Sequence, residues 1–335
     1  MTLNATLVEA TAAGVLDEPA ADLPVKAVRR KRASKHDFKD GRGRVFAHRH
    51  VNGNGWVADT AKVADTVFVN KMAQVYHNAV IEGKVALNRR AQVCGNAYIR
   101  DRVIVGDDAL VAGKAAIFDD CRILHESRVY GGRVSGSTTM YETSHIRQEA
   151  HVHNCTLRSQ AHVSGYAMVF MSSLEGAVTI TGDAKVACST MHGFVTIGGR
   201  ANVISSKLAQ QSMYFSSEEA TMFGHNKLKV LDFAVVSGVE MLSGLLTIKG
   251  RTVIAGGSIS FRPNHANGQY ERLETETDAL FPGVTISRID QFMAYNVPAS
   301  QRGRALNHVV PTVRPVNMDE LIPTRRLMTM SGDRK

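Results

Sequence analysis

Two histidines have the type and spacing to act together on one surface of the protein. His145 and His162 are seventeen positions apart, and each directly precedes a β-branched aliphatic residue, Ile146 or Val163. On equivalent strands of a repeating structure, their side chains would point outward from one face about 4.8 Å apart, with Arg128 next in the column. Imidazole and guanidinium groups in one column can bind an anion, and imidazoles can bind a metal ion. An ordinary solvated surface gives the same pattern, so both interpretations stay open.

The other reactive side chains form no motif that identifies a reaction. His225 lies in an apolar stretch with Glu218 and Glu219 and is a third candidate for a catalytic base. The sequence contains no glycine-rich nucleotide loop, nucleophile elbow or paired-carboxylate spacing. The four cysteines are far apart and include no CxxC pair, which is typical of reduced thiols rather than of a disulfide framework. We therefore expect no metal site and no cofactor.

A short basic segment holds most of the positive charge. The formal net charge of the 335 residues is +9, and residues 26–50 carry ten Lys and Arg against two Asp, a local charge of +8. This segment has no periodic apolar face, so we expect residues 1–50 to form an extended arm that is disordered unless docked. The arm would bind a polyanion, and a solvated tail is the alternative. The candidate binding residues are Arg29, Arg30, Lys31, Arg32 and Lys35.

A six-residue repeat indicates the elements that would position these side chains. From Val57 to Val129 every sixth residue, thirteen in succession, is aliphatic, and the residue two places earlier is small or compact. A period of six fits no helix, but it fits a short strand followed by a tight turn. The Gly and Asp residues that often follow tolerate the left-handed backbone of such turns. A bulkier residue recurs in the small column at every eighteenth position, which predicts triangular coils of three strands each.

The inward column continues beyond Val129 in shorter coils. From Val152 its steps run five, six and six, so that equivalent residues are seventeen positions apart. The pattern breaks at 209–229 and then returns until about residue 261. We therefore predict an all-β fold, a single-stranded parallel β-helix rod over residues 51–261 with an insertion at 209–229. Its coils would span eighteen and then seventeen positions of the sequence.

The outward residues of the early coils are unexpectedly apolar. Phe68, Ala86 and Ile104 should stack on one face. Val80 and Tyr98, followed by Ala116, should stack on the next face. Outward positions on strands that already have a core on their other side are normally polar. We therefore predict that Phe68, Ile104, Val80 and Tyr98 form an association face that another chain covers.

The hexads resemble those of the hexapeptide-repeat superfamily. The resemblance is carried by the runs Ala79–Lys84, Ala91–Asn96 and Ala109–Lys114, and it extends over most of the predicted rod. It implies that the coils are left-handed, an exception to the usual rule for parallel strands. The superfamily includes acyltransferases, γ-type carbonic anhydrases and non-catalytic proteins of bacterial or phage assemblies, and relatives are often trimers.

The resemblance also implies what catalysis would require. In the acyltransferases a histidine removes a proton from an acceptor that attacks an acyl-CoA-type thioester, a role open here to His145, His162 or His225. The γ-type carbonic anhydrases need three converging zinc-bound imidazoles, and their spaced histidine motif is absent from this sequence.

Residues 262–335 leave the repeat. Six prolines divide them into short pieces that contain apolar residues such as Phe281 and Phe292, so we expect an irregular strap docked on the rod or on a partner. No apolar stretch is long enough to span a membrane, and the first residues lack the basic start of a secretory signal. We expect a cytoplasmic protein, or a phage particle component assembled in the bacterial cytoplasm.

The hypothesis that these features favour is a structural or assembly protein without enzymatic activity. The rod would dock to other protein subunits, as a homo-oligomer such as a trimer or within a larger particle. One alternative is an acyltransferase that uses a thioester donor. The other is a nucleic-acid-associated protein that binds through residues 26–50. We expect no membrane partner.

Overall fold

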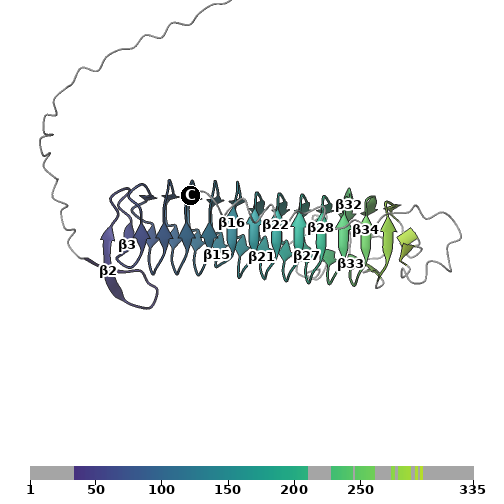
Figure 1. Cartoon of the computed structure of the whole chain (residues 1–335), viewed down its shortest axis with the longest axis horizontal. Helices are drawn as coiled ribbons and strands as arrows, with labels where there is room; N and C mark the ends of the chain where they lie inside the picture. The colour runs from purple at the N-terminus through teal and green to yellow at the C-terminus, as the bar shows by residue number, and fades with distance from the viewer. Residues whose placement is uncertain are drawn as a thin grey trace, which may run out of the picture. The chain divides into compact units, whose positions relative to one another are not determined.

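The structure is a computed structural model of the chain. The residues that it describes all belong to one of two compact units, Ala33–Lys335. They are 34–209, 228–243, 246–260, 273–275, 278–287, 291–292 and 295–296. This unit is an all-β solenoid with about 18 residues per turn, as the hexad pattern predicts. Figure 1 shows its coils stacked in one row, from the purple strands β2 and β3 to the green strands β32 and β34.

The described strands form three sheets, which we call face 1, face 2 and face 3. Face 1 contains β1 (Ser34–Asp37), β2 (Arg44–Arg49), β3 (Trp56–Ala58), β6 (Gln74–Val75), β9 (Gln92–Val93), β12 (Leu110–Val111), β15 (Arg128–Val129), β18 (His145–Ile146), β21 (His162–Val163), β24 (Thr179–Ile180), β27 (Val195–Ile197), β30 (Leu228–Val230), β33 (Leu246–Ile248) and β36 (Leu273–Glu274). Face 2 contains β4 (Lys62–Val63), β7 (Val80–Ile81), β10 (Tyr98–Ile99), β13 (Ala116–Ile117), β16 (Arg133–Ser135), β19 (His151–His153), β22 (Met168–Phe170), β25 (Lys185–Ala187), β28 (Asn202–Ile204), β31 (Val235–Ser237), β34 (Val253–Ala255) and β37 (Leu280–Pro282). Face 3 contains β5 (Phe68–Val69), β8 (Ala86–Leu87), β11 (Ile104–Val105), β14 (Arg122–Ile123), β17 (Thr139–Met140), β20 (Thr156–Arg158), β23 (Ser173–Glu175), β26 (Thr190–His192), β29 (Lys207–Ala209), β32 (Met241–Ser243), β35 (Ser258–Ser260) and β38 (Thr285–Ile286).

The strand register confirms the predicted change in coil length. Val111 pairs with Val129, which is eighteen positions later, and Val129 pairs with Ile146, which is one position closer. The predicted inward residues from Val57 to Val129 are buried, with Val63 as the half-exposed exception. Val63 lies on β4, the edge strand of face 2, so no further strand of that sheet covers it. The aliphatic columns therefore form one continuous core.

Buried serines hold the corner that is shorter in the later coils. Ser172, Ser189 and Ser206 occupy the turn between face 2 and face 3 and are almost fully buried. The Ser189 backbone N–H donates to Ser172 Oγ at 3.1 Å, and Ser189 Oγ donates to the Ala187 carbonyl at 2.8 Å. Ser206 repeats this pattern with Ser189. Each hydroxyl thus satisfies backbone groups that the shortened corner would otherwise leave buried without a partner.

Residues 34–50 do not form the extended arm that their basic composition predicted. β1 pairs antiparallel with β2, and β2 pairs antiparallel with β3, so this hairpin adds two strands to face 1. Phe38 and Ala47 are buried in a second small core with Tyr76 and neighbouring face 1 residues. These few apolar side chains outweigh the basic ones, which stay exposed on the same hairpin. Residues 1–33 of the predicted arm lie outside the described residues.

The solenoid also continues past residue 261, where the sequence pattern predicted its end. Leu273, Phe281 and Ile286 pair with the preceding coil and extend all three faces. Phe281 is fully buried and stacks on Phe292, with ring centroids 5.3 Å apart. The step from Ile254 to Phe281 is much longer than one regular coil, so the repeat is displaced and the hexad count misses it. Part of the predicted strap is therefore a further coil.

Candidate interaction surfaces

The two predicted apolar ladders are present on adjacent faces of the early coils. Tyr98 pairs with Val80 on one side and with Ala116 on the other, on face 2. Phe68 and Ile104 lie on either side of Ala86, on face 3. All of these side chains are half-exposed. The structure thus places the predicted association residues side by side, at positions another chain can reach.

Face 2 carries a second group of residues that extends its ladder. The rings of Tyr98 and Phe118 meet edge to face with centroids 5.8 Å apart. Two guanidinium groups lie over the Phe118 ring, that of Arg100 at 4.8 Å and that of Arg133 at 4.7 Å from its centroid. We call Tyr98, Phe118, Arg100 and Arg133 the Tyr98 patch. Phe118 was not predicted from the sequence, because the prediction used only the outward residues that precede each inward residue. Phe118 directly follows the inward Ile117, at a corner, and that position could have identified it.

The Tyr98 patch is pre-arranged by its own contacts. The Tyr98 hydroxyl donates to Glu82 at 3.1 Å, which fixes the far end of the ring. Each cation–π contact at a partly exposed site contributes on the order of 0.5–1 kcal/mol, so the four side chains hold one another in place. Little side-chain entropy would be lost when another surface packs against them.

His145 and His162 pair in register on face 1, as their spacing predicted. Their rings are 6.1 Å apart between centroids, in an edge-to-face arrangement, and Arg128 is next in the column. Burial lowers the pKa of both imidazoles, and the nearby Arg147 guanidinium lowers each further. Both rings are therefore largely neutral at neutral pH. The third candidate, His225, lies outside the described residues.

Of the five predicted polyanion-binding residues, the structure describes only Lys35. Lys35 is exposed on β1, and its ammonium lies 5.0 Å from the centroid of the Phe46 ring. Arg29, Arg30, Lys31 and Arg32 lie outside the described residues.

Three of the four cysteines are buried. Burial raises the pKa of Cys121 to about 12 and that of Cys155 to about 11, so both thiols stay protonated at neutral pH. Cys94 is buried beside Tyr76, and Cys188 is exposed at a corner. All four are free thiols.

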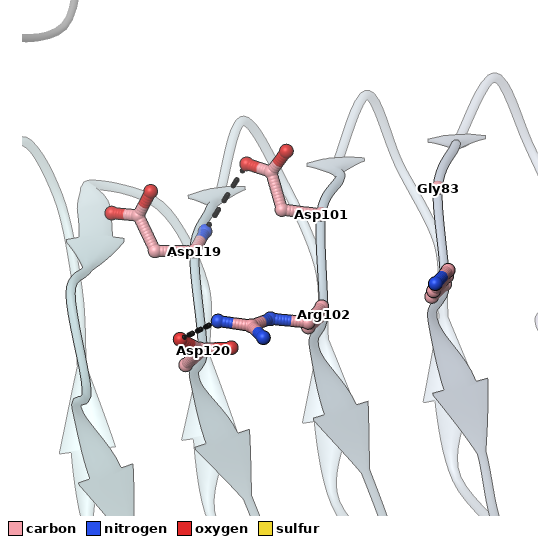
Figure 2. Close-up of a pocket in the computed structure, with 6 residues that line it drawn as sticks. Gly83, Asp101, Arg102, Asp119 and Asp120 are labelled. Atoms are coloured by element: carbon pink, nitrogen blue, oxygen red, sulfur yellow. Dashed lines mark hydrogen bonds and ion pairs between the residues drawn. The ribbon is translucent and has the colours of Figure 1, made fainter.

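An open hollow lies at the corner between face 2 and face 3 (Figure 2). It is lined by Gly83, Lys84, Asp101, Arg102, Asp119 and Asp120. Asp101 accepts the Asp119 backbone N–H at 3.2 Å, and Asp119 accepts the N–H of Gly136 at 2.8 Å. Asp120 forms an ion pair with Arg102 at 2.5 Å. Because these carboxylates already bind groups of a neighbouring coil, we interpret the hollow as part of a corner that holds successive coils together. It was not predicted from the sequence.

The N-terminal hairpin is fixed to face 1 by stacked rings. The His36 imidazole stacks on Trp56 with centroids 4.3 Å apart, and the Arg49 guanidinium lies 4.0 Å from the Trp56 ring centroid. Burial lowers the pKa of His36, and Arg49 lowers it further. Protonation of His36 is thus less favourable in the docked hairpin than in an undocked one.

We expect the hairpin to loosen at acidic pH. An undocked His36 would have a pKa of about 6.5, and the docked one has a lower pKa, so docking is unaffected well above that pH. Docking weakens as pH falls from about 6.5 through the lowered pKa. Hydrogen-exchange protection of the β2 amides should drop several-fold between pH 7.5 and pH 5. His36→Phe keeps the stacking but cannot titrate, and should remove this pH dependence. An equal drop in that variant would contradict the assignment to His36.

Comparisons with known proteins give no match to a protein-family model and no significant match to a curated protein. The membership in the hexapeptide-repeat superfamily therefore stays a prediction, whereas the parallel β-solenoid is shown by the structure. Among the residues that the structure describes, no group of three or more His, Cys, Asp or Glu could hold a metal ion. The same part of the chain contains no helix long and apolar enough to cross a membrane.

Proposed function

We propose that this protein is a structural or assembly protein, a β-helical rod that docks to other protein subunits through the Tyr98 patch and the adjoining ladder on face 3. The observation that carries the proposal is the Tyr98 patch. Tyr and Arg are enriched among the residues that dominate binding energy at protein interfaces, together with aromatic anchors that pack centrally. Here the half-exposed Tyr98 ring lies beside two guanidinium groups that pack on the buried Phe118 ring.

The solenoid supports such an interface well. Tyr98 and Ala116 project from short strands whose inward neighbours, Ile99 and Ile117, are fully buried. The backbone of each strand is hydrogen-bonded to the coils on both sides, as in the bond from the Tyr98 N–H to the Ala115 carbonyl at 2.8 Å. A rigid, flat face loses little conformational entropy on association. A multisubunit particle of a bacterium or phage is the setting that we propose, with residues 1–33 as a second docking element.

The proposal is tested by the mass of the full-length protein in solution. Since we propose that these subunits include further copies of this chain, we expect light scattering to give a multiple of the chain mass that falls to the monomer mass on dilution. Tyr98→Asp places a charge in the centre of the patch and should raise the dissociation constant about tenfold or more, because central aromatic residues contribute at least about 2 kcal/mol at such interfaces.

The matched control is Lys185→Asp. Lys185 is also an outward residue of face 2, on β25, but it lies outside the Tyr98 patch. This variant should associate like the unmodified protein. A wild-type protein that is monomeric at every concentration, or a Tyr98→Asp protein that associates unchanged, would contradict the proposal.

A further inference from the structure

Three consecutive strands of face 1 bring one guanidinium group and two imidazoles into one column. β15, β18 and β21 place Arg128, His145 and His162 side by side in register. Tyr130 and Arg147 follow at the adjoining corner, each one residue after the inward residue of its strand. We call these five residues the Arg128 cluster. Its side chains come from three successive coils and lie on one side of the solenoid.

Tyr130 holds both guanidinium groups of the cluster. The Arg128 Nη1 donates to the Tyr130 hydroxyl at 3.4 Å. The Arg147 guanidinium lies over the Tyr130 ring, 5.4 Å from its centroid. A single aromatic side chain therefore keeps two cations close to the imidazole column. Arg128 and Arg147 are exposed, and the two histidines are half-exposed, so a small ligand can reach all four.

The cluster lacks the carboxylates that accompany other arginines of this solenoid. Several corner arginines form ion pairs with an aspartate of a neighbouring coil, for example Arg90 with Asp108 at 2.5 Å and Arg251 with Asp278 at 2.6 Å. Among the described residues, neither Arg128 nor Arg147 has an ion-pair partner. The guanidinium charges of Arg128 and Arg147 are therefore not neutralised by a carboxylate of the described residues, unlike those of Arg90 and Arg251.

The charged groups that shift the pKa values of the two imidazoles are all basic. The charged groups near His145 are Arg147, His162 and Arg128, and burial together with these groups lowers its pKa. The pKa of His162 is lowered by burial and by Arg147. The next strand of face 1, β24, presents the uncharged Thr179 beside His162. The Glu149 carboxylate is close to Arg147 in sequence, but the imidazole whose pKa it raises is that of His151 on face 2.

We infer that the Arg128 cluster is a binding site for a dianionic phosphate group, such as inorganic phosphate or a phosphate monoester. The two guanidinium groups supply two permanent positive charges, which match the charge of the dianion. Arginine binds phosphate oxygens with paired N–H donors, and the ring N–H groups of His145 and His162 add further donors. The site does not depend on the proposed association through face 2.

Inorganic phosphate is the probe for this inference. The full-length protein is titrated at constant ionic strength, and the imidazole resonances of His145 and His162 are followed by NMR. We expect saturable shifts with a dissociation constant of about 1 mM and a rise in the pKa of both imidazoles on binding. The dissociation constant, expressed for the dianion alone, should therefore be lower at pH 6 than at pH 8. His151, on face 2, should not respond. Shifts that do not saturate, or that are equal at His151, would overturn the inference.

Paired variants separate a site from general surface charge. Arg128→Gln combined with Arg147→Gln should weaken phosphate binding about tenfold or more, because hydrogen bonds to charged groups are lost. The control is Arg158→Gln, since Arg158 lies over Tyr141 at 5.3 Å from its centroid, in the same arrangement but on face 3. This control should bind phosphate unchanged. Equal weakening in the two proteins would refute a specific site.

A second probe tests the charge of the ligand. Dimethyl phosphate carries a single negative charge shared by two oxygens, because its other two oxygens are methylated. It should therefore bind several-fold more weakly than inorganic phosphate at pH 8, where inorganic phosphate is mostly the dianion. Equal or tighter binding of dimethyl phosphate would overturn the assignment to a dianion.

Discussion

Replacing Ile117 by Asp should destabilise the solenoid by about 4 kcal/mol or more. Ile117 is fully buried on β13, in register with Ile99 on one side and Val134 on the other. The substitution removes an aliphatic side chain from the shared core and buries a carboxyl group without a partner. Each coil is covered by its neighbours, so the loss extends to the adjoining strands. The measurement is the free energy of unfolding from chemical denaturation.

The adjacent residue supplies the control. Ala116 precedes Ile117 on the same strand, points outward and is half-exposed. Ala116→Asp should change the free energy of unfolding by less than about 1 kcal/mol, as is usual for surface substitutions. Similar losses for the two variants would contradict the inward and outward alternation of β13.

Gly113→Ala should also be strongly destabilising, by about 3 kcal/mol or more. Gly113 has a φ of 67° at a corner, in the left-handed region that side chains rarely adopt. A Cβ atom there would approach the Tyr130 carbonyl oxygen of the next coil, far inside van der Waals contact. The coils would have to separate locally, which breaks the hydrogen bonds between them. Thermal unfolding of the full-length protein measures the effect.

Gly238 distinguishes backbone strain from the clash between coils. Its φ is 64°, almost the same as that of Gly113, but an added Cβ would have no heavy atom within 4 Å. Gly238→Ala should therefore cost only the strain of the left-handed conformation, about 1 kcal/mol. Equal losses of stability in the two variants would show that the clash with the next coil does not contribute to the requirement for glycine at position 113.

The sequence was sufficient to predict the coils because one property repeats in them. Each inward position must be aliphatic, and that requirement recurs at a fixed spacing from Val57 onward. Before Phe281 the spacing between inward residues changes abruptly. The inward residue is still apolar there, but a search at the regular spacing does not find it. The hairpin at 34–50 was missed for another reason. It is docked by a few side chains such as Phe38, which no periodicity marks.

The candidate surfaces were predictable only where they follow the strand register. Tyr98 and the pair His145 and His162 occupy outward positions at fixed spacing, so their neighbours could be inferred. Phe118 and Tyr130 lie at corners, where side-chain direction depends on the turn. Arg90 and Asp108 are separated by the length of one early coil. Their ion pair could therefore have been predicted by looking for opposite charges at that separation.

The most direct measurement of the central claim is the accessibility of Tyr98 in the associated protein. Hydroxyl-radical footprinting followed by mass spectrometry compares the oxidation of each aromatic residue in the associated and the diluted protein. Tyr98 and Phe68 should be oxidised several-fold more slowly in the associated state. Tyr166, which is 67% exposed at another corner, should react equally in both states. Equal oxidation of Tyr98 in the two states would show that face 2 stays uncovered, and the proposed docking function would then be wrong.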